Sequence, residues 1–439
     1  MTAQAFRFGV EERPPALQLL IYAAQWVAFA TYPLMFSLVL LGLGWNLEGP
    51  VLGKFIAATL WIIGLGSLLQ AFFGHALCMM SGPFVLTIFA MLESHRAGHD
   101  FASIFGALAL SGVIVAILAA SRLVGRIRPL FTPLVIGTLV MMIGLSSAPF
   151  GIRLMVAQGA GPGLAAFGLA LLCGFIALRL RGFIATVPVI VVVTLGYLLF
   201  RLLPGWWLVQ VPVLPWISPP RPALLGLRWP PLGLLILFTF VQLATAAFGM
   251  GATLGVSTAV RVRRQEGHLL RQAVINSLGE GTLAALLSAV PLVGYPGSLG
   301  FVSMTNVASR WAMAAGGALL VVLSSLGPLS ALLAAIPRPV AGAVLLAIAG
   351  MNIGLGAEIW GAGTARFTKR HAFTVGFAIF CALGFTALPP ESLRGMPNVL
   401  ALILRNPVLS AMIFVIVLDG LLFRSSPTPT AAPDTSLDD

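Results

Sequence analysis

Long apolar runs, separated by short polar connections, recur from one end of this chain to the other. A helix of about 20 mainly apolar residues is long enough to cross the roughly 30 Å hydrocarbon core of a membrane. Only 9% of the residues are charged, whereas soluble domains carry about a quarter. These runs predict an all-α membrane protein with about fourteen transmembrane segments.

The prolines and tryptophans of residues 204–229 divide the runs into two groups of seven, because this stretch cannot form a spanning helix. The predicted spans are residues 17–43, 54–73, 76–92, 101–121, 130–148, 163–178, 183–203, 230–258, 272–292, 296–310, 312–336, 339–357, 371–388 and 406–423. The predicted order is a cytoplasmic N-terminus (1–16), a first seven-span repeat (17–203), an external loop (204–229), a second seven-span repeat (230–424) and a disordered cytoplasmic tail (425–439).

The net charge of +12 follows membrane topology rather than a basic binding face. If the N-terminus is cytoplasmic and the sides alternate, most Lys and Arg residues fall in cytoplasmic segments, as the positive-inside rule requires. We therefore predict a multi-pass protein of a bacterial-type inner (plasma) membrane with both termini cytoplasmic. No basic groove with stacking aromatic residues is visible, so we predict no nucleic-acid partner.

The motifs of metal and cofactor chemistry are missing from the sequence. It has no Cys-x-x-Cys or His-Glu-x-x-His spacing, and the three cysteines lie in apolar runs, which suits buried packing. A membrane-embedded enzyme would need clustered Asp, His, Cys or Lys residues, which the spans do not offer. We expect no catalytic residue, no metal and no cofactor, and interpret the chain as a non-enzyme.

Two predicted spans at matching positions of the halves are interrupted by glycine and proline. The third span contains SGPF (81–84), and the tenth begins with YPGSLG (295–300). Matched interruptions of this kind are the sequence pattern of a transporter binding site, and an odd number of spans per half inverts the second repeat. The alternative is that these small residues only allow close helix packing.

Length arithmetic favours the first interpretation for the tenth span. A helix over 296–310 would reach about 22 Å, too short to cross. An extended segment at 296–301 followed by a helix at 302–310 would reach roughly 33 Å. Because exposed backbone is not tolerated in lipid, we expect short strands in spans 3 and 10 to line a protein-walled cavity.

The half-helices after Phe84 and Gly300 would then bring two N-termini to the midplane, where their N–H groups attract carbonyl oxygens or anions. Phe84 and Tyr295 are candidates to sandwich a flat ring. Gln242 offers a donor and an acceptor to an amide-like edge, or else it hydrogen-bonds a neighbouring helix. The other predicted substrate-binding residues are Gly297, Ser298, Leu299 and Gly300.

The segment PLVGYPGSLGFVSMTNVASR, with AAIPRPVAGAVLLAIAGMNIGLG at 334–356, resembles the nucleobase–ascorbate transporter family, the nucleobase:cation symporters of type two. The family motif runs Gln/Glu-Asn-x-Gly-x-x-x-x-Thr and is followed by an Ala-Ser-Arg-like end. The matching positions are Gly300, Thr305, 307–310, the Ile-Pro-x-Pro-Val-x-Gly element at 336–342, and Phe84 on the family's Ser-Phe element.

The resemblance implies two inverted sets of seven spans, a core domain (spans 1–4 and 8–11) and a gate domain (spans 5–7 and 12–14). It also implies elevator-like movement, a homodimer, and proton- or sodium-coupled uptake of uracil, xanthine or urate. The chain departs from the motif at Gly297 and Ser298, where the family has Gln/Glu and Asn. The family's substrate-binding Glu of span eight is Gln242 here.

Glu280, in LGEGTLAAL, is the remaining candidate for proton coupling, and it matches the family's acid–Gly pair in span nine. A charged carboxylate in the bilayer centre is costly, about 2.5–3.5 kcal/mol on insertion scales, so a retained one indicates function. A neutral, structural carboxylic acid and an exposed position at the cytoplasmic end are the two alternatives.

The sequence therefore favours a secondary transporter for a small planar nucleobase, proton-coupled or facilitative. The expected partners are this substrate, protons, the lipid bilayer and a second copy of the chain. An anion carrier of the same inverted architecture is the first alternative, because two helix N-termini without a nearby carboxylate suit an anion. A non-transporting membrane subunit is the second.

Overall fold

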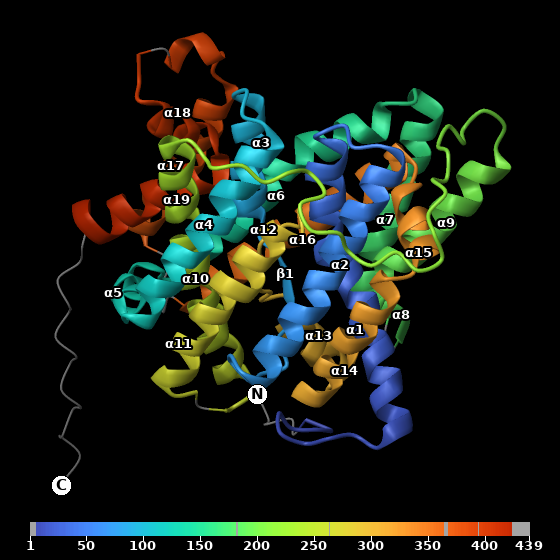
Figure 1. Cartoon of the computed structure of the whole chain (residues 1–439), viewed down its shortest axis with the longest axis horizontal. Helices are drawn as coiled ribbons and strands as arrows, with labels where there is room; N and C mark the ends of the chain where they lie inside the picture. Colours follow the sequence, from blue (N-terminus) through green and yellow to red (C-terminus); the bar gives the residue numbers. More distant parts are fainter. Residues whose placement is uncertain (1–5, 181–182, 263, 364–367, 394, 424–439) are drawn as a thin grey trace, which may run out of the picture.

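The computed structural model describes residues 6–180, 183–262, 264–363, 368–393 and 395–423, and the predicted disordered tail lies outside them. Its elements, labelled in Figure 1, are mostly helices. The first half contains α1 (Ala16–Phe36), η1 (Ser37–Leu43), α2 (Gly49–Phe72), β1 (Ser81–Pro83), α3 (Val85–Arg96), α4 (Phe101–Ala120), α5 (Leu123–Ile127), η2 (Arg128–Leu130), α6 (Pro133–Val156), α7 (Ala160–Arg179), α8 (Phe183–Thr186) and α9 (Pro188–Leu202). The second half contains α10 (Leu232–Ala259), α11 (Glu266–Ile275), η3 (Asn276–Thr282), α12 (Leu283–Leu286), β2 (Leu292–Gly294), α13 (Ser298–Thr305), α14 (Arg310–Ser324), α15 (Gly327–Ala334), α16 (Arg338–Gly363), α17 (Lys369–Ala387), η4 (Pro390–Leu393), α18 (Asn398–Arg405), α19 (Pro407–Val417) and η5 (Leu418–Leu422).

Within these described ranges, eight helices are long and apolar enough to cross a membrane, or nine if the bent pair 398–405 and 407–422 counts as one span. Two shorter apolar helices, α9 and α14, add to them. The chain is therefore a mostly helical, multi-pass membrane protein. The number of fourteen spans stays a prediction, because several predicted spans are broken into shorter helices.

The tenth predicted span differs from its expected form. The extended part was expected at 296–301 and the helix at 302–310, whereas β2 ends at Gly294 and α13 already begins at Ser298. Pro296 explains the shift, since its fixed φ suits the first turn of a helix and it cannot donate to a strand ladder. The strand instead uses apolar residues, as a strand buried on both faces requires.

The predicted span 312–336 is also not continuous. Helix α14 ends at Ser324, and α15 begins at Gly327 with Pro328 in its first turn. The 204–231 segment docks at this break, where the Ser218 N–H donates to the Ser325 carbonyl at 2.8 Å. A Cβ on Gly327 would lie 1.9 Å from the Pro215 carbonyl oxygen, so only glycine fits beside the docked backbone. No helix or strand occurs between residues 204 and 231.

Helices α6 and α16 pack closely across the two halves of the chain. Small residues spaced seven apart make this contact: Gly137, Gly144 and Gly151 of α6, and Gly342, Ala349 and Gly356 of α16. A Cβ on Gly144 would lie 2.4 Å from the Ala349 carbonyl oxygen. Seven residues are almost two helical turns, so the small residues share one face and let the backbones approach.

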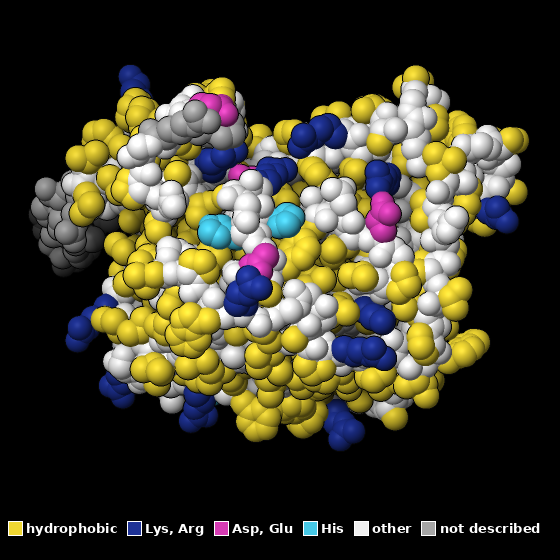
Figure 2. All heavy atoms as spheres, turned by 45° about the horizontal axis from the view of Figure 1, so that its top comes forward, with side chains coloured by type: hydrophobic (Ala, Val, Ile, Leu, Met, Phe, Trp, Pro, Cys, Tyr) yellow, Lys and Arg dark blue, Asp and Glu magenta, His cyan; other side chains and the backbone are white. Residues whose placement is uncertain are grey.

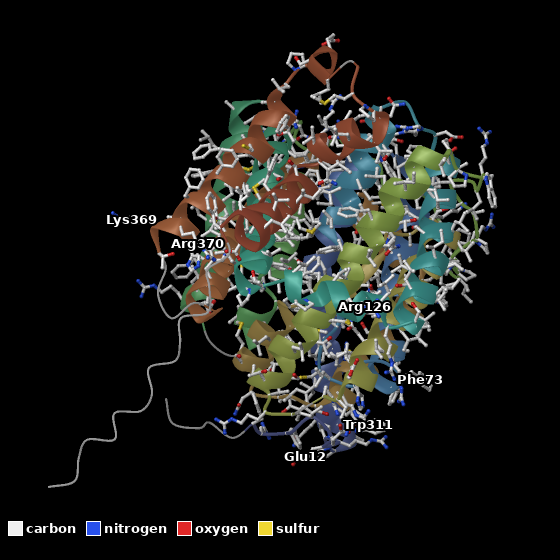
Figure 3. The ribbon with its side chains drawn as sticks, turned by 90° about the vertical axis from the view of Figure 1, so that its left-hand side faces the viewer. Glu12, Phe73, Arg126, Trp311, Lys369 and Arg370 are labelled. Carbon is white, nitrogen blue, oxygen red and sulfur yellow. The ribbon has the colours of Figure 1, made fainter. Side chains whose placement is uncertain are left out.

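The surface has two polar ends and an apolar middle. Figure 2 shows hydrophobic side chains over most of the face it presents, with the acidic residues and histidines in its upper half and Lys and Arg residues both there and along the lower edge. One end, which we call the N-terminal face, carries residues 6–15, and Figure 3 shows Glu12 and Trp311 there. We call the opposite end, where the 204–231 segment docks, the loop face.

Candidate functional site

A two-stranded ribbon at the centre of the molecule joins the two halves of the chain. Strand β1 pairs antiparallel with β2, with Ser81 opposite Gly294 and Pro83 opposite Leu292. All residues of both strands are buried. Because the strands are antiparallel, α3 and α13 leave from opposite ends of the ribbon, so their N-terminal N–H groups point toward its centre.

Hydrogen bonds beyond the strands hold the ribbon ends in register. The Tyr295 N–H donates to the Met80 carbonyl at 2.9 Å, and the Phe84 N–H donates to the Pro291 carbonyl at 3.3 Å. The hydroxyl of Ser298 accepts from the Met80 N–H at 3.1 Å. Ser298, a predicted substrate ligand, thus uses its side chain to fix β1 to the start of α13.

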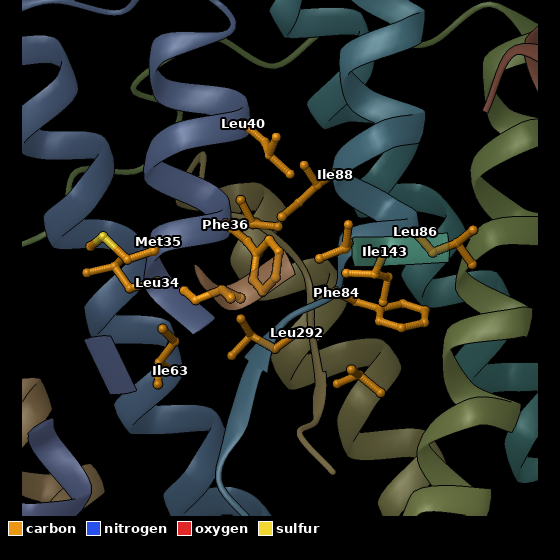
Figure 4. Close-up of a cluster of buried hydrophobic side chains, with 14 of the residues drawn as sticks. Leu34, Met35, Phe36, Leu40, Ile63, Phe84, Leu86, Ile88, Ile143 and Leu292 are labelled. Carbon is orange, nitrogen blue, oxygen red and sulfur yellow. The ribbon is translucent and has the colours of Figure 1, made fainter. Parts of the chain in front are cut away.

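A small, partly open cavity lies against the ribbon. Its volume is about 30 Å³, enough for one or two water molecules and too small for any heterocyclic ring. Its wall is Phe36, Pro83, Phe84, Val85, Val140, Ile143, Phe248, Val293, Tyr295, Pro296, Gly297, Asn352 and Leu355. Figure 4 shows Phe84, Ile143 and Leu292 within the surrounding apolar cluster. Both the ribbon and the α6–α16 pair contribute to this wall.

Aromatic rings make up much of the cavity wall. The Phe84 and Phe248 rings lie 4.8 Å apart between centroids, with an angle of 31° between their planes. The Tyr295 ring contacts Tyr32 and Phe29 of α1, at 6.0 and 5.9 Å between centroids. Phe84 and Tyr295 therefore lie on one cavity, as the sandwich hypothesis requires, and the nearest ring to Phe84 is Phe248.

Asn352 of α16 is a cavity residue that the sequence interpretation missed. Its side chain is only 5% exposed, and its Nδ2 donates to no group in the described part of the chain. A buried amide nitrogen without a partner costs about 1–3 kcal/mol, so it is poised for a ligand acceptor. The detectable signal was a lone carboxamide in the apolar run AIAGMNIGLG, since polar residues inside spans are rare and functional.

Three of the predicted substrate residues, Phe84, Tyr295 and Gly297, line the cavity. Leu299 and Gly300 follow in the first turn of α13 and do not form its wall. Gly300 is exposed and lies inside α13, which begins at Ser298. The prediction that a half-helix begins after Gly300 is therefore wrong.

Gln242 of α10 faces span nine instead of the cavity. A Cβ on Gly281 of η3 would lie 2.8 Å from its Nε2. The side chain is 1% exposed, and neither amide atom has a hydrogen-bond partner among the residues described. The helix–helix hydrogen bond considered for Gln242 is therefore not formed with any described residue.

Glu280 lies behind the ribbon, fully buried. One carboxylate oxygen is hydrogen-bonded to the Ser81 hydroxyl at the start of β1. The other accepts from Gln70 Nε2 at 3.1 Å and Asn276 Nδ2 at 2.9 Å. The position excludes exposure at the cytoplasmic end and leaves proton coupling and a structural role open. Either way, Glu280 connects α2, η3 and β1, and so controls where the ribbon sits.

The Glu280 hydrogen bonds have a chemical consequence. The two amide nitrogens can only donate, whereas the Ser81 hydroxyl can donate or accept. An ionised Glu280 would thus accept from all three groups, and a protonated one would donate to Ser81. Gain or loss of one proton would reverse the direction of a hydrogen bond to the ribbon.

Comparisons with known proteins show which family the chain belongs to. A family profile described as Xan_ur_permease, Permease family, matches residues 17–391. The uric acid transporter UacT of Escherichia coli K12 is 25% identical over 394 residues, which cover 85% of this chain and 80% of UacT. The putative purine permease CPE0397 of Clostridium perfringens is 23% identical and covers 96% of this chain and 94% of its own. The uracil permease of Escherichia coli K12 is 26% identical, with 80% of each chain covered.

Two solved structures share the fold at low sequence identity. The transmembrane domain of the cyanobacterial bicarbonate transporter BicA is 13% identical, with a TM-score of 0.56 over 94% of this chain and all of that domain. SLC26A9 is 12% identical, with a TM-score of 0.59 over 94% of this chain and 66% of its own. The profile match over most of the chain, together with these uric acid, purine and uracil relatives, shows that the protein belongs to the nucleobase–ascorbate transporter family of membrane permeases.

Proposed function

We propose that this protein is a secondary transporter that carries a small planar nucleobase, a purine or pyrimidine such as xanthine, urate or uracil. The observation that carries the proposal is the cavity at the ribbon, whose wall contains Phe84, Tyr295 and the Asn352 amide nitrogen, which has no hydrogen-bond partner among the described residues. Its relatives are named as uric acid, purine and uracil transporters, which supports the same class of cargo.

The proposed contacts follow from the chemistry of a nucleobase, a flat ring with donors and acceptors on its edge. Phe84, with Phe248 behind it, offers a face for stacking, and Tyr295 closes the other side. The Asn352 amide and the backbone at Gly297 meet the polar edge. The residues that contact the base directly would be supported from behind by Gln242, Ser298, Leu299 and Gly300. The amide of Gln242 would be available as a further hydrogen-bond partner for the base.

The small volume of the cavity supports a transport mechanism in which parts of the protein move relative to one another. A base cannot enter about 30 Å³, so the walls must separate for binding. Phe84 and Tyr295 belong to the proposed core domain, whereas Ile143 and Asn352 belong to spans five and twelve of the proposed gate domain. Elevator-like displacement of the core against the gate would open and close the site between them.

Proton coupling is proposed to run through Glu280. A proton taken up there would turn its hydrogen bond with Ser81 from accepting to donating, and Ser81 starts the strand that carries Phe84. The proposal further places the protein in the plasma membrane as a homodimer, with both termini in the cytoplasm.

Uptake into vesicles tests this function. The purified protein would be reconstituted and given labelled xanthine, urate and uracil, with and without an inward proton gradient. We expect saturable uptake of at least one base, increased by the gradient and unaffected by excess sulfate or dicarboxylate. Saturable uptake of labelled sulfate or dicarboxylate, without uptake of any base, would favour an anion carrier and reject the proposal. No saturable uptake of either class would indicate a non-transporting subunit.

A further inference from the structure

A second hollow lies on the outside of the molecule, far from the ribbon in sequence and lining. It is an open groove of about 410 Å³, walled by α4, by Thr282 of η3 and by the end of the 204–231 segment. Its α4 residues, Gly106, Ala109, Leu110 and Val113, are spaced as one helical face. Apart from Arg228 and Thr282, its lining residues are apolar.

The groove runs from the loop face toward the middle of the membrane. Its α4 lining runs from Gly106 to Val113, which is about 10 Å along the helix axis, and Asp100, which caps α4, lies about 9 Å before Gly106. One leaflet of the hydrocarbon core is about 15 Å thick, and its headgroups lie beyond it. The groove therefore has room for part of one lipid acyl chain, and the Asp100 end of α4 lies on the headgroup side of it.

Two opposite charges lie at the loop-face end of the groove, Arg228 in its lining and Asp100 just beyond it. Arg228 NH1 lies 3.2 Å from Asp100 Oδ2, and both side chains are substantially exposed, at 70% and 46%. Hydrogen bonding from Ser103, chiefly from its side chain, lowers the pKa of Asp100, so the carboxylate stays ionised. Trp229 beside them is 80% exposed, as suits a membrane interface.

An exposed ion pair of this kind contributes little to stability, so its partners can be exchanged at low cost. A zwitterionic headgroup can replace both partners at once, because its phosphate can pair with the Arg228 guanidinium and its ammonium with the Asp100 carboxylate. A primary ammonium has three N–H donors for Asp100, whereas a quaternary ammonium has none. An anionic headgroup without an amine would leave Asp100 facing like charge.

We propose that this groove is a binding site for one phosphatidylethanolamine molecule, with an acyl chain along α4 and the headgroup between Arg228 and Asp100. The backbone of the 227–230 segment fixes the headgroup end, because the Arg228 N–H donates to the Ala102 carbonyl at 3.0 Å. Gly106 permits this approach, since a Cβ there would lie 1.8 Å from the Arg228 carbonyl oxygen. The inference does not depend on the transported substrate.

Native mass spectrometry of the full-length, delipidated protein tests the site. Palmitoyl-oleoyl phosphatidylethanolamine, phosphatidylcholine and phosphatidylglycerol would be added separately. We expect one phosphatidylethanolamine to be retained about tenfold more strongly than the other two lipids, as one charge-assisted hydrogen bond implies. Arg228→Gln and Asp100→Asn should each remove this preference, and asparagine keeps the cap on α4. Arg221→Gln, an exposed arginine of the same segment, is the matched control.

A substitution that fills the groove with a large side chain gives an independent test of the site. Val113→Trp should abolish retention of phosphatidylethanolamine, whereas Ile117→Trp, an exposed α4 position outside the groove, should not. Equal retention of the three lipids by the wild type would overturn the proposal, as would unchanged retention in Val113→Trp. Loss of a dimer in Val113→Trp, with lipid retention unchanged, would instead assign the groove to a second copy of the chain.

Discussion

At the scale of single residues, two features define the site. Some buried polar groups lack hydrogen-bond partners, and one buried acid has several. The Asn352 amide nitrogen and both amide atoms of Gln242 are buried without partners in the described ranges, whereas Glu280 is hydrogen-bonded to three side chains. The first pattern is typical of a place where a ligand completes the hydrogen bonding. The second is typical of a group whose protonation state is tied to its surroundings.

Asn352→Leu should lower substrate affinity and raise stability together. Leucine matches the size of asparagine and removes the unsatisfied amide, so the free energy of unfolding should increase by about 1 kcal/mol. The substrate KM should increase about tenfold, because one edge hydrogen bond is lost. Thermal unfolding and uptake kinetics measure both effects.

The matched control for that change is Thr253→Val. Thr253 is a fully buried hydroxyl of α10 without a partner among the described residues, and it does not line the cavity. It should gain stability in the same way and leave KM unchanged. An unchanged KM in Asn352→Leu would remove Asn352 from the binding site.

Glu280→Gln should separate coupling from folding. Glutamine can still accept from Gln70 or Asn276 through its oxygen and can donate to Ser81, so the protein should fold. It cannot release a proton, so uptake should continue without a response to the proton gradient. Glu358→Gln, which changes an exposed acid of α16, is the control. Gradient-driven uptake that survives in Glu280→Gln would leave Glu280 a structural role only.

At the scale of elements, the first strand of the ribbon could be predicted from sequence and the second could not. The SGPF interruption coincides with β1, whereas β2 lies at Leu292–Gly294, before the YPGSLG interruption and the predicted extended part at 296–301. The exact strand depended on whether Pro296 would end the extended part or start the helix. That choice is decided by tertiary hydrogen bonds such as Met80 to Ser298, which no local pattern records.

The same limit applies to the candidate site. Phe84, Tyr295 and Gly297 could be found because they flank the interruptions. Asn352 could be noticed as a lone carboxamide in an apolar run but could not be placed in the site, because the direction in which it faces depends on how closely α16 packs on α6 through small residues. Gln242 was predicted in the site from its donor–acceptor chemistry and from the family's substrate-binding Glu at this position, whereas the structure turns it toward Gly281.

Gly144→Leu tests that helix contact. A side chain there meets the Ala349 carbonyl, so the backbones must separate, at a cost of about 1–3 kcal/mol or more. Gly174→Leu in α7 is the matched control, because a Cβ there has open space and should be neutral. Unfolding temperatures in detergent give the comparison, and equal values for the two variants would mean that α6 and α16 do not pack this closely.

At the scale of the whole molecule, contacts between the ribbon and the loop face hold α3 against the α18–α19 break. Glu93 of α3 lies 3.8 Å from Arg405, and the Asn406 amide donates to the Leu86 carbonyl at 3.3 Å. These groups connect the proposed core to the proposed gate. They would have to separate for the cavity to open toward this face.

Asn406→Asp should favour that opening. The aspartate still caps α19 through the Leu409 N–H but loses the donor to Leu86. A cysteine at Val140 on the cavity wall, in a background without the native cysteines, should then react several-fold faster with a polar thiol reagent. Asn398→Asp, at the far end of α18, is the control. An unchanged reaction rate in Asn406→Asp would mean that this contact does not hold the site closed.

The account rests most heavily on a nucleobase binding at the ribbon cavity. The direct measurement is uptake of labelled xanthine, urate and uracil by vesicles containing the wild type, Phe84→Ala or Phe73→Ala, the last an exposed ring outside the site. We predict saturable uptake of at least one base by the wild type and by Phe73→Ala, and at least a tenfold loss in Phe84→Ala as its stacking face is removed. Wild-type kinetics in Phe84→Ala, or no uptake of any base by the wild type, would contradict the account.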